Sequence, residues 1–587
     1  MYLQWLFLFV LKRDNLHSIF DIKKISFSLF FVLVASATLA QRSFYFPPIQ
    51  KDTAQKKKIE IIKSDSLIFQ TLELGRYRKL IGNVKLKHID AYMFCGSAII
   101  DIEANYMTAY GKQVHIKKGD SIDVWGNFLE YFGDQKFGRL TGMCSMRDNT
   151  MILTTPELNY NTETDVGSYM SGGRIVNKET TITSAIGYYY HQQSTAIFYG
   201  DVVLKDKERT IHADSLRYNT TKEIAYFITK TTIIDKDSNI IVTNRGYYDT
   251  KLEKAFFGNN TEIKKGDASV KAETIDYDNK TKIAIAKNNV VFQDSSERTT
   301  MLSNYIYSDE NKSLVLAYRD PLMITVSENQ KDTMYLSADT LLTYKIASTD
   351  SLQVNDSISG NDSIKILKAW HHMKLIQGKM SAIADSLFYS ESDSIFKMYY
   401  APALWMDSTQ ITGDSIYLYN RNNEIYKVDI YNNAFIINLQ DVEIYNQTKG
   451  KFMQAFLKNK EMEKVDVDGN AESIYFIKDK ENAYNGANKS SSAFITVSFD
   501  KGEVNRIKLT GTPEAEFTPM KKINASTYRL DGFTWYGNKQ PLTKYDVIRD
   551  KAQYEKYING LPIKKVEIIE EKKEENSMET EQDNKEE

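Results

Sequence analysis

The sequence predicts an all-β fold built as a repeat array, and three observations support this prediction. Aromatic residues make up 12% of the chain, with 38 Tyr against 9 Pro and 28 Gly, a mixture that favours strands. A segment recurs about every 30 residues, as in HADSLRYNTTKEIAYF (212–227) and KAETIDYDNKTKIAIA (271–286). Within each copy, apolar and polar residues alternate with the period of a strand that is buried on one face.

The period is marked by the last residue of each DSLRY-like run, which we call the slot residue. The first slot residues lie 29 to 31 positions apart: Phe69, Ile100, Tyr131, Tyr160, Tyr189, Tyr218, Tyr248, Tyr277 and Tyr307. Two longer steps follow, to Thr343 and Tyr389, before the series resumes at Leu418. A polar turn such as NTETD (161–165) follows the slot, and a second short run such as IAYF (224–227) follows the turn. Each copy is therefore predicted to be one strand–turn–strand rung of a stack.

Alternation within the rungs predicts which face lies inside. The position two before the slot is mostly apolar, as at Leu67, Ala98, Leu129, Leu158, Leu216, Ile275, Tyr305 and Ile474, and only Gly187 and Gly246 interrupt this row. The residue just before the slot is mixed, which indicates that some rungs are covered on both faces. An acid or Asn opens many runs, among them Asp65, Asn127, Glu273, Asp339, Asp385 and Asp414, and we expect these residues at the edge of the apolar face.

The ends and one insertion divide the chain into predicted regions. Lys23 and Lys24 precede an apolar run at 25–34 and a small-residue stretch at 35–41, so residues 1–40 are predicted to be a signal peptide or an N-terminal anchor. Repeats are expected at 58–345 and 369–510, separated by a polar insertion at 346–368. Residues 511–562 are expected to cap the stack, and 563–587 to form a disordered acidic tail.

Composition and spacing argue against several function classes. A formal net charge of -2 leaves no electrostatic footprint for nucleic acid. Adjacent His371 and His372 would point to opposite faces of a strand, and no catalytic motif is present, so we expect neither a metal site, a cofactor nor an enzyme. Cys95 and Cys144 occupy different phases of the repeat, which favours free, buried thiols. His115, Lys117 and Lys118 fit a solvated turn better than a site for lipid phosphates.

Several segments resemble a known family. Residues 82–133, IHADSLRYNTTKEIAYF (211–227) and the stretch 445–476 are similar to the OstA-like family. This family groups with the organic-solvent-tolerance proteins, and its relatives include the lipopolysaccharide-transport proteins LptA and LptC and the N-terminal domain of LptD. The resemblance covers roughly residues 58–532. It implies an elongated, open β-jellyroll whose interior receives lipid A acyl chains and whose strand edges stack on other transport proteins of this kind or on further copies of the chain.

The resemblance and the alternation together predict a non-enzymatic lipopolysaccharide-transport protein of the periplasm, with association with the outer membrane left open. An apolar groove would offset the cost of moving acyl chains through water, about 0.8 kcal/mol per exposed CH₂. Alternation predicts that the groove is lined by Leu67, Phe69, Leu129, Tyr131, Leu158, Tyr160, Leu216, Tyr218, Tyr248, Ile275 and Tyr277. Two alternatives remain: a structural or adhesive β-repeat protein with a filled core, and an inner-membrane-anchored member of the same machinery.

Overall fold

The structure is a computed structural model that describes residues 57–72, 75–327, 332–347, 363–421, 424–458, 461–500 and 503–560. The description below concerns the second of the two units of the chain, Lys58–Glu587. The predicted signal segment 1–40, residues 348–362 of the predicted insertion and the predicted tail 563–587 lie outside the described residues.

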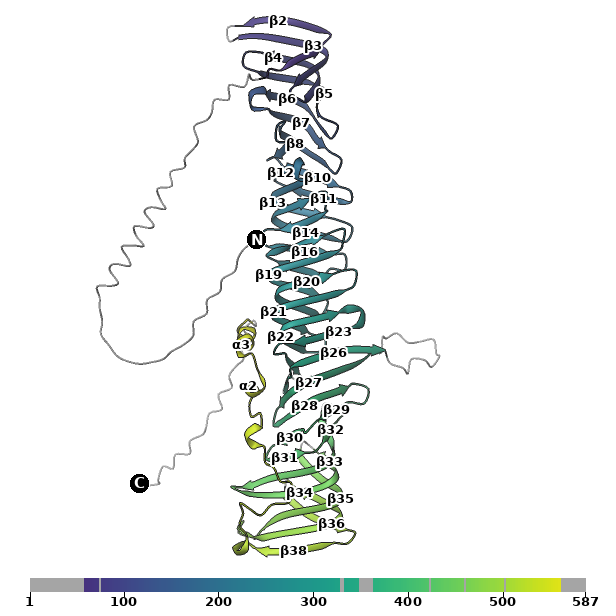
Figure 1. Cartoon of the computed structure of the whole chain (residues 1–587), viewed down its shortest axis with the longest axis vertical. Helices are drawn as coiled ribbons and strands as arrows, with labels where there is room; N and C mark the ends of the chain where they lie inside the picture. The colour runs from purple at the N-terminus through teal and green to yellow at the C-terminus, as the bar shows by residue number, and fades with distance from the viewer. Residues whose placement is uncertain are drawn as a thin grey trace, which may run out of the picture. The chain divides into compact units, whose positions relative to one another are not determined.

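The described residues of the second unit form a single antiparallel array of 38 strands (Figure 1). This confirms the all-β prediction. Each described strand pairs only with strands at most three places away in the numbering, so each rung is hydrogen-bonded only to its neighbours. Such an arrangement grows by repetition, which is why the sequence shows a fixed period.

The strands of the first half are β1 (Glu60–Lys63), β2 (Ser66–Leu72), β3 (Gly75–His88), β4 (Ala91–Asp101), β5 (Tyr106–Lys118), β6 (Ile122–Phe132), β7 (Phe137–Arg147), β8 (Ile152–Asn161), β9 (Val166–Tyr169), β10 (Gly173–Asn177), β11 (Thr180–Ser184), β12 (Ile186–Tyr190), β13 (Thr195–Lys205), β14 (Arg209–Asn219), β15 (Ile224–Phe227), β16 (Thr231–Asp235), β17 (Ile240–Thr243), β18 (Arg245–Asp249), β19 (Lys254–Lys265) and β20 (Ala268–Asp278).

The second half continues with β21 (Ile283–Asp294), β22 (Thr299–Asp309), β23 (Leu314–Tyr318), β24 (Leu322–Val326), β25 (Thr333–Ser337), β26 (Thr340–Ala347), β27 (Ser363–Gln377), β28 (Met380–Ser390), β29 (Ile395–Tyr399), β30 (Ala403–Met406), β31 (Thr409–Thr412), β32 (Ser415–Arg421), β33 (Glu424–Asp441), β34 (Ile444–Lys458), β35 (Glu461–Lys478), β36 (Tyr484–Asp500), β37 (Glu503–Thr510) and β38 (Glu514–Pro519). Two short helices follow, α2 (Lys544–Val547) and α3 (Lys551–Asn559).

Many rungs bend once, at a pair of residues with left-handed backbone. Gly82 and Asn83 have φ of 77° and 46°, and the strand register with β4 shifts at this point. The pair recurs at Gly200/Asp201, Asn259/Asn260, Asn288/Asn289, His371/His372, Asn432/Asn433 and Gly469/Asn470. Gly and Asn are favoured because they tolerate this conformation better than other residues do. We call each bend a corner; it divides the rung into two arms.

The acids and Asn residues that open many runs lie at these corners. The side chain of Asn83 donates to Asp65 at 2.8 Å, that of Asn289 donates to Glu273 at 2.6 Å, and that of Asn433 donates to Asp414 at 3.0 Å. Each bond joins one rung to the next. The repeated acid therefore has a structural role, which is to tie successive corners together.

The histidine pair is one of these corners. His371 contacts Asp385 at 3.1 Å, and His372 contacts Asp339 at 2.9 Å. The two rings therefore serve different rungs. In the part of the chain that the structure describes, no cluster of three or more His, Cys, Asp or Glu side chains is placed to hold a metal ion.

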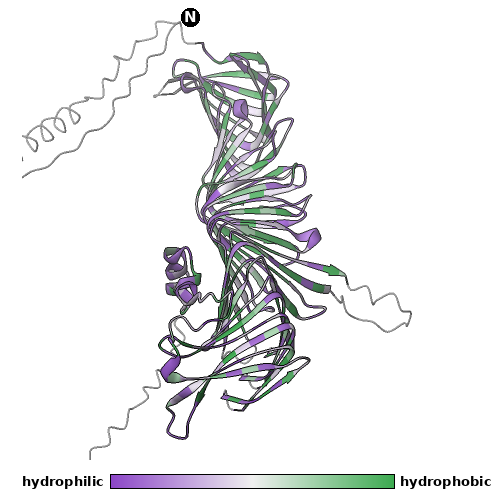
Figure 2. Ribbon diagram, turned by 60° about the horizontal axis from the view of Figure 1, so that its bottom comes forward, coloured by the Kyte–Doolittle hydropathy of each residue, from purple (hydrophilic) through white to green (hydrophobic). Residues whose placement is uncertain are grey.

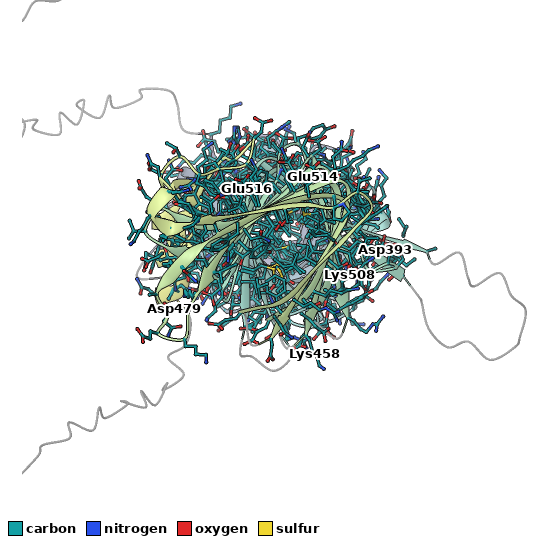
Figure 3. All side chains as sticks on the ribbon, turned by 90° about the horizontal axis from the view of Figure 1, so that it is seen from below. Asp393, Lys458, Asp479, Lys508, Glu514 and Glu516 are labelled. Atoms are coloured by element: carbon teal, nitrogen blue, oxygen red, sulfur yellow. The ribbon has the colours of Figure 1, made fainter. Side chains whose placement is uncertain are left out.

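The two arms of a rung face each other across the core. We call the arm that ends at the slot residue the tyrosine arm and the other the facing arm. Figure 2 shows hydrophobic and hydrophilic residues alternating along the strands, and the end view in Figure 3 shows side chains filling the space between the arms. The labelled charged residues, such as Asp393, Lys458 and Asp479, lie at the periphery (Figure 3).

Residues 520–560, which we call the strap, run along the outer face of the array (Figure 1). Leu530, with Phe533 and Trp535 beside it, packs against an outer apolar cluster that includes Phe435 and Phe476. Further along, Val547, Ile548 and Tyr554 pack against Leu302, Leu322, Ile324 and Ile376. The structure thus confirms that some rungs are covered on both faces, and it identifies the strap as the cover.

The inward face shifts by one residue at two rungs. Ile306 is 3% exposed and belongs to the interior cluster, so its neighbours Tyr305 and Tyr307 point outward. Ile474 and Phe476 likewise face the strap, whereas Tyr475 lies inside. The prediction that Tyr305 and Ile474 face inward is therefore wrong.

Among the helices of the described residues, none has the length and apolar character needed to cross a membrane.

Candidate functional site

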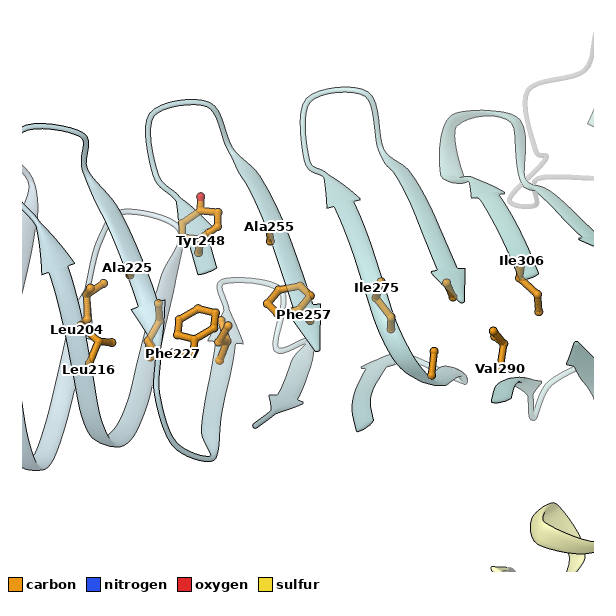
Figure 4. Packing of buried hydrophobic residues seen from close by; sticks show 14 of the residues in the cluster. Leu204, Leu216, Ala225, Phe227, Tyr248, Ala255, Phe257, Ile275, Val290 and Ile306 are labelled. Atoms are coloured by element: carbon orange, nitrogen blue, oxygen red, sulfur yellow. The ribbon is translucent and has the colours of Figure 1, made fainter. Parts of the chain in front are cut away.

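The facing arm contributes an unbroken row of apolar side chains to the interior. Each member is the register partner of the next: Leu86, Met93, Ile116, Val124, Met146, Leu153, Ile175, Ile182, Leu204, Ile211, Ile233, Ile241, Ile263, Val270, Phe292, Met301, Met323, Leu336, Leu375, Ala382, Leu404 and Ile411. The core is therefore continuous along the stack, and Figure 4 shows part of it between Leu204 and Ile306.

On the tyrosine arm, the slot tyrosines alternate with very small residues. Tyr131 pairs with Gly138, and the pattern continues to Tyr277 and Ala284. The ladder reads Tyr131, Gly138, Tyr160, Gly167, Tyr189, Ala196, Tyr218, Ala225, Tyr248, Ala255, Tyr277 and Ala284. A small residue on each side leaves room for each phenol ring to extend toward the facing arm.

The same small residues let the two arms touch. A Cβ added at Gly138 would lie 3.7 Å from Cδ1 of Ile116 on the facing arm, and one added at Gly167 would lie 2.6 Å from the sulfur of Met146. Met146 belongs to the facing arm, so this part of the interior is filled. Gly187 has a related role because the ring of Tyr169 occupies the space that its Cβ would need.

Three slot tyrosines hydrogen-bond across the gap to polar side chains at the end of the facing arm. The hydroxyl of Tyr131 lies 2.7 Å from His88 Nδ1, that of Tyr189 donates to Asp148, and that of Tyr218 donates to Asn177 Oδ1 at 3.2 Å. The partners precede the tyrosines by 43, 41 and 41 residues. The same kind of contact therefore closes three of the four rungs from Tyr131 to Tyr218.

Further bonds strengthen this closure. Lys118 forms an ion pair with Asp165 at 2.6 Å and donates to the carbonyl of Thr162 at 2.5 Å. Asn177 also donates to the carbonyl of Thr220 at 3.1 Å. We call this set the seam: His88, Lys118, Asp148 and Asn177 of the facing arm with Tyr131, Asp165, Tyr189 and Tyr218 of the tyrosine arm. It holds the ends of the two arms together.

The seam is dry. Tyr131, Tyr160 and Tyr218 are fully buried, and burial raises the pKa of Tyr131 and of Tyr218 to about 12. Burial likewise raises the pKa of Tyr160, and the negative charge of Asp165 adds to that effect. These hydroxyls therefore stay protonated over the physiological pH range, so each of them is able to donate a hydrogen bond.

Beyond the seam, the interior becomes accessible. Leu204 and Ile211 of the facing-arm row are fully buried and Ile233 is 3% exposed, whereas Ile241 and Ile263 are only partly buried. On the tyrosine arm the side chains of the ladder become partly exposed from Tyr277 onward. We call this opening the mouth: Ile241, Ile263, Val270 and Phe292 of the facing arm with Tyr277, Ala284, Val315 and Thr343 of the tyrosine arm, all of them partly buried.

Ion pairs between long side chains also span the mouth. Lys265 of the facing arm pairs with Glu310 at 2.6 Å. Glu297 pairs with Lys345 at 3.2 Å and with Lys365 at 3.1 Å. Burial would raise the pKa of Glu297, but these two lysines lower it. The mouth is therefore lined by partly buried apolar side chains and bridged by partly exposed ion pairs, which stabilise little.

The residues predicted to line a groove fall into three groups. Leu129, Tyr131, Leu158, Tyr160, Leu216, Tyr218, Tyr248 and Ile275 lie in the interior at 0–3% exposure. Tyr277 is partly buried at the mouth. Leu67 and Phe69 belong to the terminal strand β2 and are 43% and 72% exposed. Lipid contact at any of them stays a prediction.

The sequence interpretation missed the seam and the small residues. A Gly or Ala follows each slot tyrosine from Tyr131 to Tyr277 by seven positions, and this spacing is visible in the sequence. Lys118 also lies in the seam rather than in a solvated turn, with a side chain that is 13% exposed. His115 stacks on Trp125 and contacts Asp123 at 2.6 Å.

Cys95 and Cys144 are free and buried, as expected. Burial raises the pKa of each thiol to about 11. Both are therefore inert thiols of the core at physiological pH.

Comparison with known proteins gives one family match. The family model of the OstA-like proteins matches residues 56–214 and 200–271, which confirms the resemblance over this part of the chain. Among solved structures, the chain is similar to LptH, described as the LptA-homologous periplasmic component of the lipopolysaccharide transport device of Pseudomonas aeruginosa. The identity is 14%, the TM-score is 0.17, and the match covers 19% of this chain and 80% of LptH. No curated protein matches the chain.

Proposed function

Because the part of the chain from residue 56 to residue 271 is OstA-like, we propose that this protein takes part in lipopolysaccharide transport in the periplasm and that it is not an enzyme. Its role is to hold lipid A acyl chains in the apolar interior. The acyl chains enter at the mouth, between the rungs of Ile241 and Thr343. The sealed part that precedes the mouth serves as a rigid support.

The change from seam to mouth is the observation that carries this proposal. From Leu86 to Ile233 the side chains of the facing-arm row are at most 3% exposed, and the arms touch, so an acyl chain has no room there. From Ile241 to Phe292 the side chains of the same row are partly accessible to solvent. On the tyrosine arm opposite, Ala284 and Val315 are partly accessible as well. The mouth is thus an apolar surface that runs across several rungs and is reachable from solvent.

The energetics suit a carrier. Each CH₂ that moves from water into an apolar site gains about 0.8 kcal/mol, so a chain of ten buried methylenes would gain about 8 kcal/mol before the cost of ordering it. Only exposed ion pairs such as Glu297–Lys345 have to give way, and pairs of this kind are worth about 0–1 kcal/mol each. Loading through the mouth is therefore favourable without any chemical step.

The two ends of the array support the proposal that partner proteins add to it edge to edge. Within the described residues, β1 and β2 pair only with β3, and β37 and β38 pair only with β36. Ile68 and Phe69 of β2 are 48% and 72% exposed. An unpaired edge with exposed apolar side chains favours addition of another strand, from a transport partner or from a second copy of the chain.

A second candidate function is a structural β-repeat protein with a filled core. The sealed seam favours it, because tight packing between the arms would serve a strut equally well. Photocrosslinking separates the two. A photoreactive residue at Phe292 samples the mouth, one at Tyr218 samples the seam, and one at Arg217 samples the outer face of the same strand.

We expect lipid adducts at Phe292 and none at Arg217 when the protein is crosslinked in cells and analysed by mass spectrometry. An adduct at Tyr218 as well would extend the binding region into the sealed part. No adduct at either Phe292 or Tyr218 would contradict the carrier and favour the structural role.

A further inference from the structure

Arg209 is a charged residue that faces the interior at the point where the seam ends and the mouth begins. It lies two positions before the fully buried Ile211 on β14, so its side chain is on the inward face. Its guanidinium carbon is 3.9 Å from the ring centroid of Tyr248, which belongs to the opposite arm. Arg209 therefore takes the place, relative to Tyr248, that Asn177 takes relative to Tyr218.

The contact differs from the seam in one respect. The seam side chains find polar partners, whereas Arg209 Nε is buried and, within the described residues, has no hydrogen-bond partner. Burial raises the pKa of Tyr277 to about 12, and the positive charge of Arg209 opposes that rise, so its charge also reaches the first tyrosine of the mouth. An arginine with a free donor at the entrance to an apolar site is suited to bind an anion.

The nearby carboxylates are engaged elsewhere. Asp206 accepts from the backbone amides of Glu208 and Arg209, both at 2.8 Å. Glu208 pairs with Lys236 at 2.7 Å. Asp235 accepts from the backbone amide of Asn239 at 2.9 Å and from its side chain at 2.8 Å. None of the described carboxylates forms an ion pair with Arg209, so the guanidinium remains free for an external anion.

We infer that Arg209 binds the anionic headgroup, a phosphate monoester or carboxylate, of an amphiphile whose hydrocarbon chain occupies the mouth. The inference rests on the proposed function and adds to it a headgroup contact at the seam end of the mouth. The ring of Tyr248 holds the guanidinium in place, and the hydrocarbon chain runs from there past Tyr277 toward Phe292. Arg209 then acts as a specificity residue, because it favours charged over neutral headgroups.

The test uses the full chain and two probes with the same hydrocarbon chain, dodecyl phosphate and dodecanol. Both are measured below their aggregation concentrations by displacement of the uncharged fluorophore N-phenyl-1-naphthylamine. The matched control for Arg209→Gln is Arg217→Gln, because Arg217 lies on the same strand, 4.2 Å over the ring of Tyr226, but on the outer face. Arg209→Lys is included as a variant that keeps the charge.

We expect the wild type and Arg217→Gln to bind dodecyl phosphate about tenfold more tightly than dodecanol, which corresponds to about 1.4 kcal/mol. Arg209→Gln should lose this preference and keep its affinity for dodecanol, and Arg209→Lys should keep most of it. Equal binding of both probes by the wild type, or a preference that survives in Arg209→Gln, would overturn the inference and leave the proposed function standing. Displacement by neither probe would contradict both.

Inorganic phosphate separates the two sources of the anion. If phosphate alone at millimolar concentration leaves the preference intact, the ligand is the headgroup of the amphiphile. If it abolishes the preference without affecting dodecanol, the anion site is supported and its ligand is free phosphate.

Discussion

The hydroxyl of Tyr189 donates a hydrogen bond to the buried carboxylate of Asp148, which lies 41 residues earlier and on the opposite arm. The same carboxylate accepts from the backbone amides of Thr150 at 2.7 Å and Met151 at 2.9 Å, and from His191 Nδ1 at 3.0 Å. Burial alone would raise the pKa of Asp148, but these bonds lower it below its ordinary value of 3.8. The ionised carboxylate therefore anchors the middle of the seam.

Replacement of Asp148 by Asn should loosen the seam. An amide offers one acceptor oxygen to donors that now share two, so buried donors lose partners at a cost of about 1–3 kcal/mol. Hydrogen exchange should show faster exchange in residues 147–152 and 186–193 of this variant at pH 7. Asp120→Asn, in an exposed turn, is the control and should leave the exchange unchanged.

The effect of Asp148→Asn should also depend on pH. A group whose pKa is lowered in the folded state contributes stability above its ordinary pKa and loses it as the pH falls through the lowered value. The difference between wild type and variant should therefore be full at pH 7 and shrink below about pH 3.8. A difference of the same size at pH 7 and pH 2 would show that the carboxylate charge does not anchor the seam.

The inward rows could be predicted from the sequence wherever only one face of a rung is apolar. Leu158, Tyr160, Leu216 and Tyr218 lie inside because the residues between them, such as Arg217, are polar and can only face water. A strand with period-two alternation has one register that buries its apolar set.

The prediction failed where both faces are apolar. In Tyr305–Ile306–Tyr307 every residue is apolar enough for either face, so alternation does not choose between two registers. The register at Phe476 is set by the strap, which covers the outer face from about 50 residues further along the chain. Packing between segments this far apart leaves no local pattern in either of them.

The seam could be predicted only in part. The small residue seven positions after each slot tyrosine is a local signal. The partners His88, Asp148 and Asn177 are different residue types in turns that look solvated, and their burial follows only when the two arms face each other. The mouth is harder still to predict from the sequence. Ile233 and Ile241 are the same residue type, and their different exposure depends on the residues that face them from the other arm.

The alternation of tyrosines with small residues can be tested at Ala225. This residue is fully buried and lies between Tyr218 and Tyr248 on the ladder. Leucine at this position would push the two rings apart, and overpacking of a filled core costs about 1–3 kcal/mol. Ala225→Leu should lower the urea midpoint and speed exchange in β14 and β18. The control is Ile224→Leu, at the outward-facing position beside it; an equal effect of both substitutions would contradict the ladder.

Two buried glutamines hold the strap. Gln447 accepts from the amide of Leu530 at 2.8 Å and donates to the carbonyl of Tyr528 at 3.1 Å. Gln410 makes the same pair of bonds to Tyr536, at 2.7 Å, and to Thr534, at 2.8 Å. Both glutamines are fully buried. Each side chain supplies the strap with the two backbone hydrogen bonds that a neighbouring strand would otherwise supply.

Gln447→Ala should therefore release the strap locally. It leaves one amide and one carbonyl of the strap without partners, at a cost of about 1–3 kcal/mol each. We expect faster hydrogen exchange at residues 528–536 and faster cleavage by trypsin after Lys521 or Lys522, whereas the exposed Gln440→Ala should change neither. Protection of the strap that survives in a Gln410→Ala/Gln447→Ala double variant would show that apolar packing alone holds it.

The tyrosines of the seam should make the protein sensitive to alkali. Tyr131 and Tyr218 have pKa values of about 12 when folded and near 10 when unfolded, so the folded state keeps protons that the unfolded state has lost between these values. Their contribution to stability is complete below pH 10 and falls by about 1.4 kcal/mol per pH unit for each tyrosine from pH 10 to 12. Phenylalanine at both positions should remove the part of this dependence that Tyr131 and Tyr218 contribute, while costing some stability at pH 7. Unfolding midpoints in urea at pH 8, 10 and 11, with phenolate absorbance at 295 nm, measure both effects.

Tyr400→Phe, at a 74% exposed side chain, is the control and should follow the wild type. If the double variant lost stability between pH 10 and 11 as steeply as the wild type, burial would not raise the pKa of these two hydroxyls in the folded state.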